Sequence, residues 1–168
     1  MSTDWAEVYR TTFQDLVRYL YRKVWDAERA QDLAQESFVR VLDDAPDNPR
    51  AWLFTVAANL ARDEARTVVR RKKHLTLLKA ESDEVSPAED PVDRMERETR
   101  VEAAKQALGE LSDRDQEVLL LWDSGFNYRE IADRTGLAIG AIGTTLARAR
   151  KRLVAAYEAA EERNVARG

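Results

Sequence analysis

The sequence contains no cysteine, and only one histidine, two methionines, four prolines and six glycines among its 168 residues. Without cysteine, the chain has no disulfide, thiol nucleophile or cysteine-based zinc site. No stretch approaches the ~18 uninterrupted apolar residues of a membrane span. The N-terminus, MSTDWAEVYR, lacks the basic and then apolar order of a signal peptide. We therefore expect a cytoplasmic protein with no membrane insertion.

Residues suited to catalysis are equally sparse. The single histidine, His74, lies in a basic run and is interpreted as a helix-end residue. No nucleophile and base stand out as a set. The sequence also has no Gly-rich phosphate loop and no cluster with metal-ligand spacing. We predict that the protein is not an enzyme, has no catalytic residues and needs no metal or other cofactor.

Charge is abundant but unevenly placed. The net charge is -4, yet residues 1–75 carry 13 basic and 12 acidic side chains, and residues 103–168 carry 10 of each. The acidic excess lies in residues 76–102, which hold nine acidic and four basic side chains. Basic side chains cluster at 66–73 and 148–152. Two such patches suit contact with nucleic acid, although cations at helix C-termini would give the same pattern.

Helical periodicity dominates the N-terminal part. Apolar residues recur at steps of three and four in three segments, at residues 5–25, 26–42 and 49–74. Asp26 is suited to cap the second helix, and Asn48 followed by Pro49 marks the start of the third. We expect a three-helix bundle over residues 5–75, with these aromatic side chains in its core: Trp5, Phe13, Trp25 and Trp52.

A linker and a second helical domain follow. Residues 79–93 read KAESDEVSPAEDPVD, a composition typical of a flexible, acidic linker, which we place at 76–102. Further on, Asn127 and Glu130 have the spacing of a capping box, and Gly136 supplies a turn before another helix. This pattern predicts a helix-turn-helix within a domain at 103–160, although an ordinary helical hairpin has the same outline. The fold class is therefore all-α, with two small domains.

A helix-turn-helix would place its second helix in the major groove of DNA. The hydroxyls of Thr144 and Thr145, near the start of that helix, could bond base edges. The basic residues that follow are better placed for phosphates, namely Arg148, Arg150, Lys151 and Arg152.

Several segments together resemble one protein family. They are Asp32-Leu-Ala-Gln-Glu-Ser-Phe38, Pro49-Arg-Ala-Trp-Leu-Phe-Thr-Val-Ala-Ala-Asn59-Leu-Ala-Arg-Asp63, Leu111-Ser-Asp-Arg-Asp-Gln-Glu-Val-Leu-Leu-Leu121, Tyr128-Arg-Glu-Ile-Ala132 and Leu146-Ala-Arg-Ala-Arg150. In this order and at these separations, they resemble the extracytoplasmic-function (ECF) group of the sigma-70 family of bacterial sigma factors. The resemblance covers residues 8 to 157 apart from the linker. It implies a promoter-reading subunit of RNA polymerase.

The resemblance also implies roles for particular residues. An acidic and amide face on the second helix would grip the clamp helices of the largest polymerase subunit, through Asp32, Gln35 and Glu36. The third helix and the preceding loop would recognise and melt the -10 element, through Asp47, Asn48, Asn59, Arg62, Asp63 and Arg66. Arg129 would join the -35 contacts, and the linker would thread through the polymerase cleft. The family further implies contact with the flap of the second-largest subunit and control by an anti-sigma protein.

Two points leave alternatives open. The family usually carries basic residues where this chain has Gly143 and Thr145, so its -35 contacts are expected to be unusual or weaker. A transcription regulator that binds DNA through the helix-turn-helix alone would explain residues 111–157. It would leave the Asp32–Phe38 and Trp52–Asp63 segments unexplained, and direct polymerase binding separates the two readings.

Overall fold

The computed structural model describes residues 2–75 and 89–167, and side chains within them except those of 68–75. All regular structure in these ranges is helical, and the chain divides into two compact units, Met1–Ala80 and Glu81–Gly168. The expected all-α fold with two domains is confirmed. Much of the predicted acidic linker, residues 76–88, lies outside the described residues.

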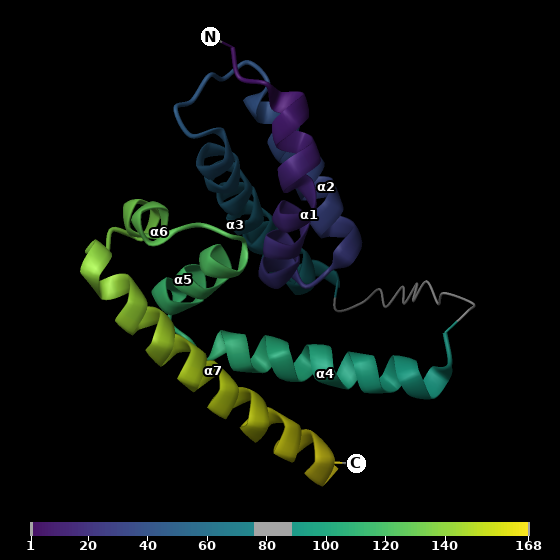
Figure 1. Cartoon of the computed structure of the whole chain (residues 1–168). Coiled ribbons are helices and arrows are strands. Elements are labelled where there is room, and N and C mark those ends of the chain that lie inside the picture. Colours follow the sequence, from purple (N-terminus) through teal and green to yellow (C-terminus); the bar gives the residue numbers. More distant parts are fainter. Residues whose placement is uncertain (1, 76–88, 168) are drawn as a thin grey trace. The chain divides into compact units, whose positions relative to one another are not determined.

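The first unit is a bundle of three helices, α1 (Trp5–Val24), α2 (Ala27–Val41) and α3 (Pro49–Leu75), and each packs on the other two (Figure 1). Side chains just before α2 and α3 cap the first turns of these helices. The carboxylate of Asp26 accepts the backbone N–H of Arg29 at 3.1 Å, and Asn48 Oδ1 accepts that of Ala51 at 3.1 Å. Each bond satisfies a donor that the first helical turn leaves unpaired, so the two predicted caps are confirmed.

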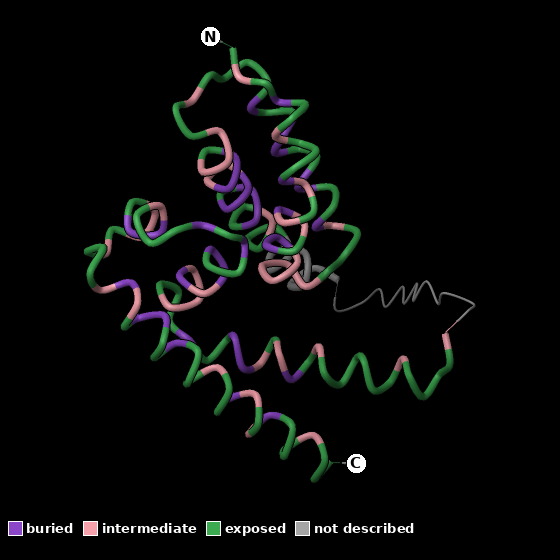
Figure 2. Tube along the Cα trace, in the orientation of Figure 1, coloured by how far each residue is buried: buried purple, intermediate pink, exposed green. Residues whose placement is uncertain are grey.

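Figure 2 shows that buried residues line the inner sides of these helices while their outer sides stay exposed. The ring of Tyr19 meets that of Phe54 edge-on, with centroids 5.0 Å apart. Of the aromatic residues expected in the core, Trp5 is buried, whereas Phe13 and Trp25 are only half-buried. The core prediction for Trp52 is wrong, because 40% of this residue is exposed.

The second unit holds four helices, α4 (Pro91–Gly109), α5 (Asp113–Asp123), α6 (Tyr128–Thr135) and α7 (Ile139–Arg167). The predicted capping box is present, since Asn127 and Glu130 each accept the other's backbone N–H, at 2.9 and 3.1 Å. Gly136 ends α6 with φ of +77°. Because α4 begins at Pro91, residues 91–102 of the predicted linker are helical.

Small side chains line the pairing of α4 with α7. α4 buries Ala103 and Ala107, and α7 buries Ala156 and Ala160. The two helices run in opposite directions (Figure 1). Burial raises the pKa of Tyr157 on α7, and Glu161 adds to the shift. α5 and α6 pack against the earlier part of α7, so the helix-turn-helix and the α4–α7 pair share one long helix.

No helix among the described residues combines the length and the apolar character that a membrane span requires. Within the same residues, no group of three or more His, Cys, Asp or Glu side chains is arranged to hold a metal ion.

Candidate nucleic-acid interface

The first candidate surface is the outer side of α2. Asp32, Gln35 and Glu36 are all exposed, and their spacing of three and four places them on one face of the helix. The carboxylate of Asp32 lies 3.4 Å from Arg29, and that of Glu36 lies 2.9 Å from Arg40. These surface pairs hold the carboxylates without covering them. The face therefore presents acidic and amide groups to solvent.

Two apolar residues extend this surface, and sequence reasoning missed them. Val39 is 68% exposed and Leu42 is 56% exposed. Val39 follows Gln35 by four residues and so lies on the same side of α2. Together with Leu42 it places apolar surface beside the charged face. Val39 falls between the core positions Phe38 and Val41, but an apolar residue next to core positions does not by itself indicate exposure.

The second candidate surface lies along α3. Asn59, Arg62, Asp63 and Arg66 are exposed, and their spacing of three, four and seven aligns them along one side. Ala57 and Ala61 face the opposite way and are buried. The structure therefore brings these four predicted residues together on a polar strip, with an amide at one end and an arginine at the other.

The loop before α3 supplies the remaining two predicted residues. Asp47 is exposed. Asn48 is also exposed, but its Oδ1 already caps α3. The indole N–H of Trp52 donates to the carboxylate of Asp44 at 2.7 Å, and this contact accounts for the position of Trp52 outside the core. The loop is thus tied to α3 at two points.

The third candidate surface is the start of α7. Thr144, Arg148 and Lys151 are exposed and lie on one side of the helix by their spacing of four and seven. Thr145 is buried, with 6% of its surface exposed. The expectation that Thr145 contacts DNA is therefore wrong. It follows Ile142 by three residues, and this spacing turns it toward the core together with Leu146 and Ala149.

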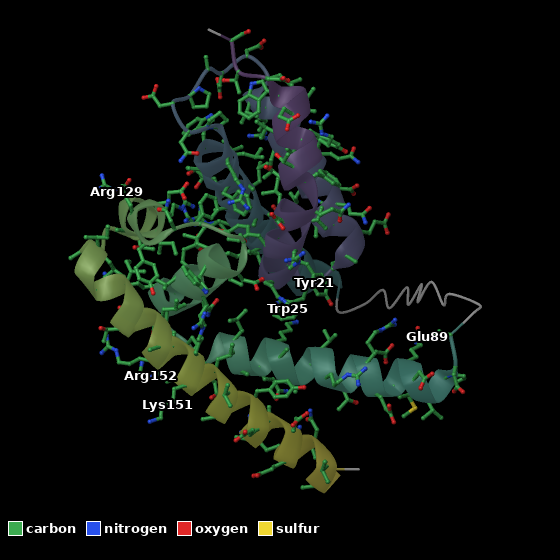
Figure 3. All side chains as sticks on the ribbon, viewed as in Figure 1. Tyr21, Trp25, Glu89, Arg129, Lys151 and Arg152 are labelled. Carbon is green, nitrogen blue, oxygen red and sulfur yellow. The ribbon has the colours of Figure 1, made fainter. Side chains whose placement is uncertain are left out.

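The other predicted cations are spread around the unit. In Figure 3, Arg129 projects from α6, well apart from Lys151 and Arg152 on the middle of α7. The guanidinium of Arg150 lies over the ring of Trp122, 5.9 Å from its centroid. Arg152 pairs with Asp115 of α5 at 3.5 Å. The structure does not bring these three arginines into one cluster.

An aromatic pair borders the same surface and was not predicted. The rings of Trp122 and Tyr128 lie 5.3 Å apart, and the two residues are 38% and 40% exposed. A side chain at Gly143 would meet the Tyr128 ring at 3.5 Å. Tyr128 therefore lies beside the first turns of α7, where the sequence has glycine in place of a long side chain. Aromatic exposure of this kind cannot be read from helical spacing alone.

Comparison with known proteins connects these surfaces to a family. Residues 8–71 match the model of sigma-70 region 2, and residues 102–153 match the model of sigma-70 region 4. The chain is 31% identical over 153 residues to the RNA polymerase sigma factor YlaC of Bacillus subtilis, covering 88% of each protein. The chain belongs to the sigma-70 family.

Other relatives indicate the group within the family. The chain is 30% identical over 156 residues to the ECF RNA polymerase sigma factor SigE of Mycolicibacterium smegmatis, covering 89% of this chain and 60% of that protein. The sigma factor RpoE of Bartonella quintana, solved with the anti-sigma factor NepR, superposes with a TM-score of 0.62 at 26% identity. That match covers 92% of this chain and 97% of the solved chain.

The resemblance to ECF sigma factors is confirmed. This sigma factor binds core RNA polymerase and directs transcription initiation from specific promoters. The α2 and α3 surfaces both lie within the region 2 match, and the α7 surface lies within the region 4 match.

Proposed function

We propose that residues 5–75 of this sigma factor dock on core polymerase and recognise and melt the -10 element, while residues 103–160 bind the -35 element. The observation that carries the proposal is that one small bundle exposes two different polar faces, one on α2 and one on α3. A bundle that had only to bind duplex DNA would need one face. The protein acts in the cytoplasm, where polymerase works, as a binding subunit without catalytic residues of its own.

The α2 face is suited to the polymerase clamp. Its carboxylates, Asp32 and Glu36, complement a basic helix, and Gln35 can donate and accept hydrogen bonds. Val39 gives this face an apolar contact that excludes water next to the charged pairs. Contacts of this mixed kind favour a specific protein partner over a polyanion, which the two carboxylates would repel.

The α3 face is suited to the opened -10 element. Asn59 offers both a donor and an acceptor, as needed to read the edge of an unpaired base. Arg62 and Arg66 can pair with phosphates on the strand that leaves the duplex. Asp47 and Asn48 lie in the loop at the start of the same helix and complete the set. Opening the duplex costs a few kcal/mol, which contacts to splayed bases help to offset.

The α7 face is suited to the -35 element. Thr144 lies nearest the helix start, where side chains meet base edges, and Arg148 and Lys151 follow on the same side. We assign the phosphate contacts to these two cations and to Arg129. Arg150 and Arg152 are secondary candidates, because one stacks on Trp122 and the other pairs with Asp115.

We further infer that an anti-sigma protein regulates this chain. The Bartonella relative was solved in complex with such a protein. The α2 face combines carboxylates with exposed valine and leucine and is therefore a surface that a competitor of polymerase could cover. The flap of the second-largest polymerase subunit is the partner we propose for the second unit.

Reconstitution with core RNA polymerase tests the proposal. The assay measures the affinity for core and then transcription from a library of promoter fragments. Gln35→Ala combined with Glu36→Lys should weaken core binding at least about tenfold, because one change removes a hydrogen-bonding group and the other reverses a charge at the interface. Glu158→Lys, an exposed position on α7, is the control for the charge reversal and should bind core like the wild type.

The same experiment distinguishes a sigma factor from a transcription regulator that binds DNA alone. A wild type that folds but never binds core, and instead binds a specific duplex tightly by itself at high salt, would establish the stand-alone regulator. Weak binding of the free chain to duplex DNA and tight binding of the holoenzyme supports the sigma-factor mechanism, since the free protein carries a net charge of -4.

A further inference from the structure

Asp44 forms three hydrogen bonds from the short segment between α2 and α3. Its backbone N–H donates to the carbonyl of Val41 at 2.9 Å. Its own carbonyl accepts the indole N–H of Trp5 at 3.1 Å, and its carboxylate accepts the indole N–H of Trp52 at 2.7 Å. A single residue of the loop is therefore held by the end of α2, by α1 and by α3.

Trp52 is much more exposed than the residues that follow it on α3. The residues that follow it, Leu53 and Phe54, are 0% and 1% exposed, whereas Trp52 is 40% exposed. A tryptophan left in contact with water forgoes much of the free energy that its burial would supply. A hydrogen bond to a carboxylate is shorter and stronger than one between neutral groups. Trp52 therefore contributes to the loop and not to the bundle core.

The loop is fixed at both ends. Asp44 holds one end, and Asn48 holds the other because its Oδ1 accepts the Ala51 N–H at 3.1 Å. Three residues separate these points, and one of them is Pro46, whose ring restricts the backbone. A segment this short, restrained at each end, limits the positions that Asp47 can take before a base binds. Such preorganisation reduces the entropy lost on binding.

We propose that Asp44 and Trp52 form a clasp that holds the loop of residues 45–48 in the shape that receives an unpaired base of the -10 element. Trp52 is then a positioning residue, which acts on DNA through Asp44 and the loop. This inference rests on the role proposed above for Asp47 and Asn48. Trp5 supports the loop independently of this clasp, because its indole N–H bonds the backbone carbonyl of Asp44 and not the side chain.

The clasp can be tested with three substitutions at its two side chains. Trp52→Phe keeps an aromatic ring but loses the N–H donor, and Asp44→Ala loses the acceptor. Asp44→Asn keeps an oxygen that can accept from the indole. Each holoenzyme is assayed for the equilibrium of promoter opening, using a promoter obtained in the reconstitution experiment. A second promoter set replaces each non-template -10 base in turn with an abasic site.

We expect Trp52→Phe and Asp44→Ala to lower promoter opening about five- to tenfold, the size expected for the loss of one solvent-exposed hydrogen bond. Asp44→Asn should stay within about twofold of the wild type. A variant that combines Trp52→Phe with Asp44→Ala should be no worse than either single variant. All variants should bind core equally. At the abasic position that most impairs the wild type, the variants should match it, because the pocket then has no base to hold.

Indole N–H resonances supply an independent readout from the full-length protein. Asp44→Ala should shift the signal of Trp52 most and leave those of Trp25 and Trp122 in place. Opening by Asp44→Ala or Trp52→Phe equal to the wild type on the intact promoter would overturn the clasp. A defect that persists unchanged at every abasic position would show a merely structural role. A wild type insensitive to all abasic sites would instead overturn the pocket itself, and with it the role given to the clasp.

Discussion

The guanidinium of Arg29 donates to both carboxylate oxygens of Glu64, with each N···O distance 2.8 Å. This two-point bond joins the start of α2 to the middle of α3. Hydrogen bonding to Glu64 raises the pKa of Arg29 above its ordinary value, so the side chain stays charged at every accessible pH. Arg29 also lies 3.4 Å from Asp32, on the proposed polymerase face. One cation thus contacts both helices that carry the proposed functional faces of the first unit.

Removing this bond should loosen the first unit. Arg29→Ala leaves the half-buried Glu64 carboxylate without its two donors, so we expect a loss of about 1–2 kcal/mol in the free energy of unfolding. The measurement is hydrogen exchange of α2 and α3 peptides in the full chain. Arg18→Ala is the control, because Arg18 is exposed and 3.9 Å from Asp15, and such pairs contribute about 0–1 kcal/mol. Equal effects from the two substitutions would contradict the importance of the two-point geometry.

Two glycines of the helix-turn-helix should respond in opposite ways to alanine. Gly136 has φ of +77° and no atom within 4 Å of an added Cβ, so the cost of Gly136→Ala is one of backbone strain, about 1 kcal/mol. Gly140 also has open space and lies within α7. Gly140→Ala should stabilise the unit by up to about 1 kcal/mol. The two variants are compared by thermal unfolding and by hydrogen exchange of the α6 and α7 peptides. A lower stability in both variants would contradict this assignment.

The apolar part of the α2 face should matter for docking. Val39→Asp places an unpaired charge where we expect contact with polymerase, so affinity for core should fall at least about tenfold. Val92→Asp is the matched control, since Val92 is 62% exposed on α4 and Val39 is 68% exposed. Fluorescence anisotropy with labelled sigma factor measures both. If Val39→Asp binds core with the affinity of the wild type, Val39 does not contribute to docking and only the polar residues of the α2 face do.

Salt dependence should separate phosphate contacts on α7 from base contacts. Lys151→Ala should lower the slope of log K against log salt for holoenzyme binding to the promoter by about 0.9, the contribution of one phosphate contact. Thr144→Ala should leave the slope unchanged and alter the preference for -35 sequences. Lys105→Ala, at an exposed position on α4, is the control for loss of a cation. If the slope is the same in Lys151→Ala as in the wild type, Lys151 does not contact a phosphate in the complex.

Local signals in the sequence predicted the helix starts well, because each depends on residues a few positions apart. Asp26, Asn48 and Asn127 all cap helices as expected. Trp52 shows where such reasoning fails. It lies one position before the buried Leu53, at the edge of the core face of α3, and its partner Asp44 is in a loop whose path the sequence does not reveal. For Trp52, a specific hydrogen bond to the loop eight residues earlier outweighed the apolar pattern.

Thr145 is a different kind of failure. Its chemistry suited DNA, but its spacing from Ile142 and Leu146 already put it on the core side of α7. The helical period of α7 therefore determines the orientation of Thr145, whatever the chemistry of its hydroxyl group. The proposed site on α2 could be predicted only in part, because the charged residues were visible in the resemblance while the exposure of Val39 required the structure.

The unbroken course of α7 has a geometric consequence. Its 29 residues span about 43 Å at 1.5 Å per residue. The proposed -35 contacts lie in its first half, and its second half packs along α4. One continuous helix therefore separates the proposed -35 contacts from the start of α4. Because a helix without a kink curves only gently, we expect tolerance of the spacing between the two promoter elements to arise outside α7.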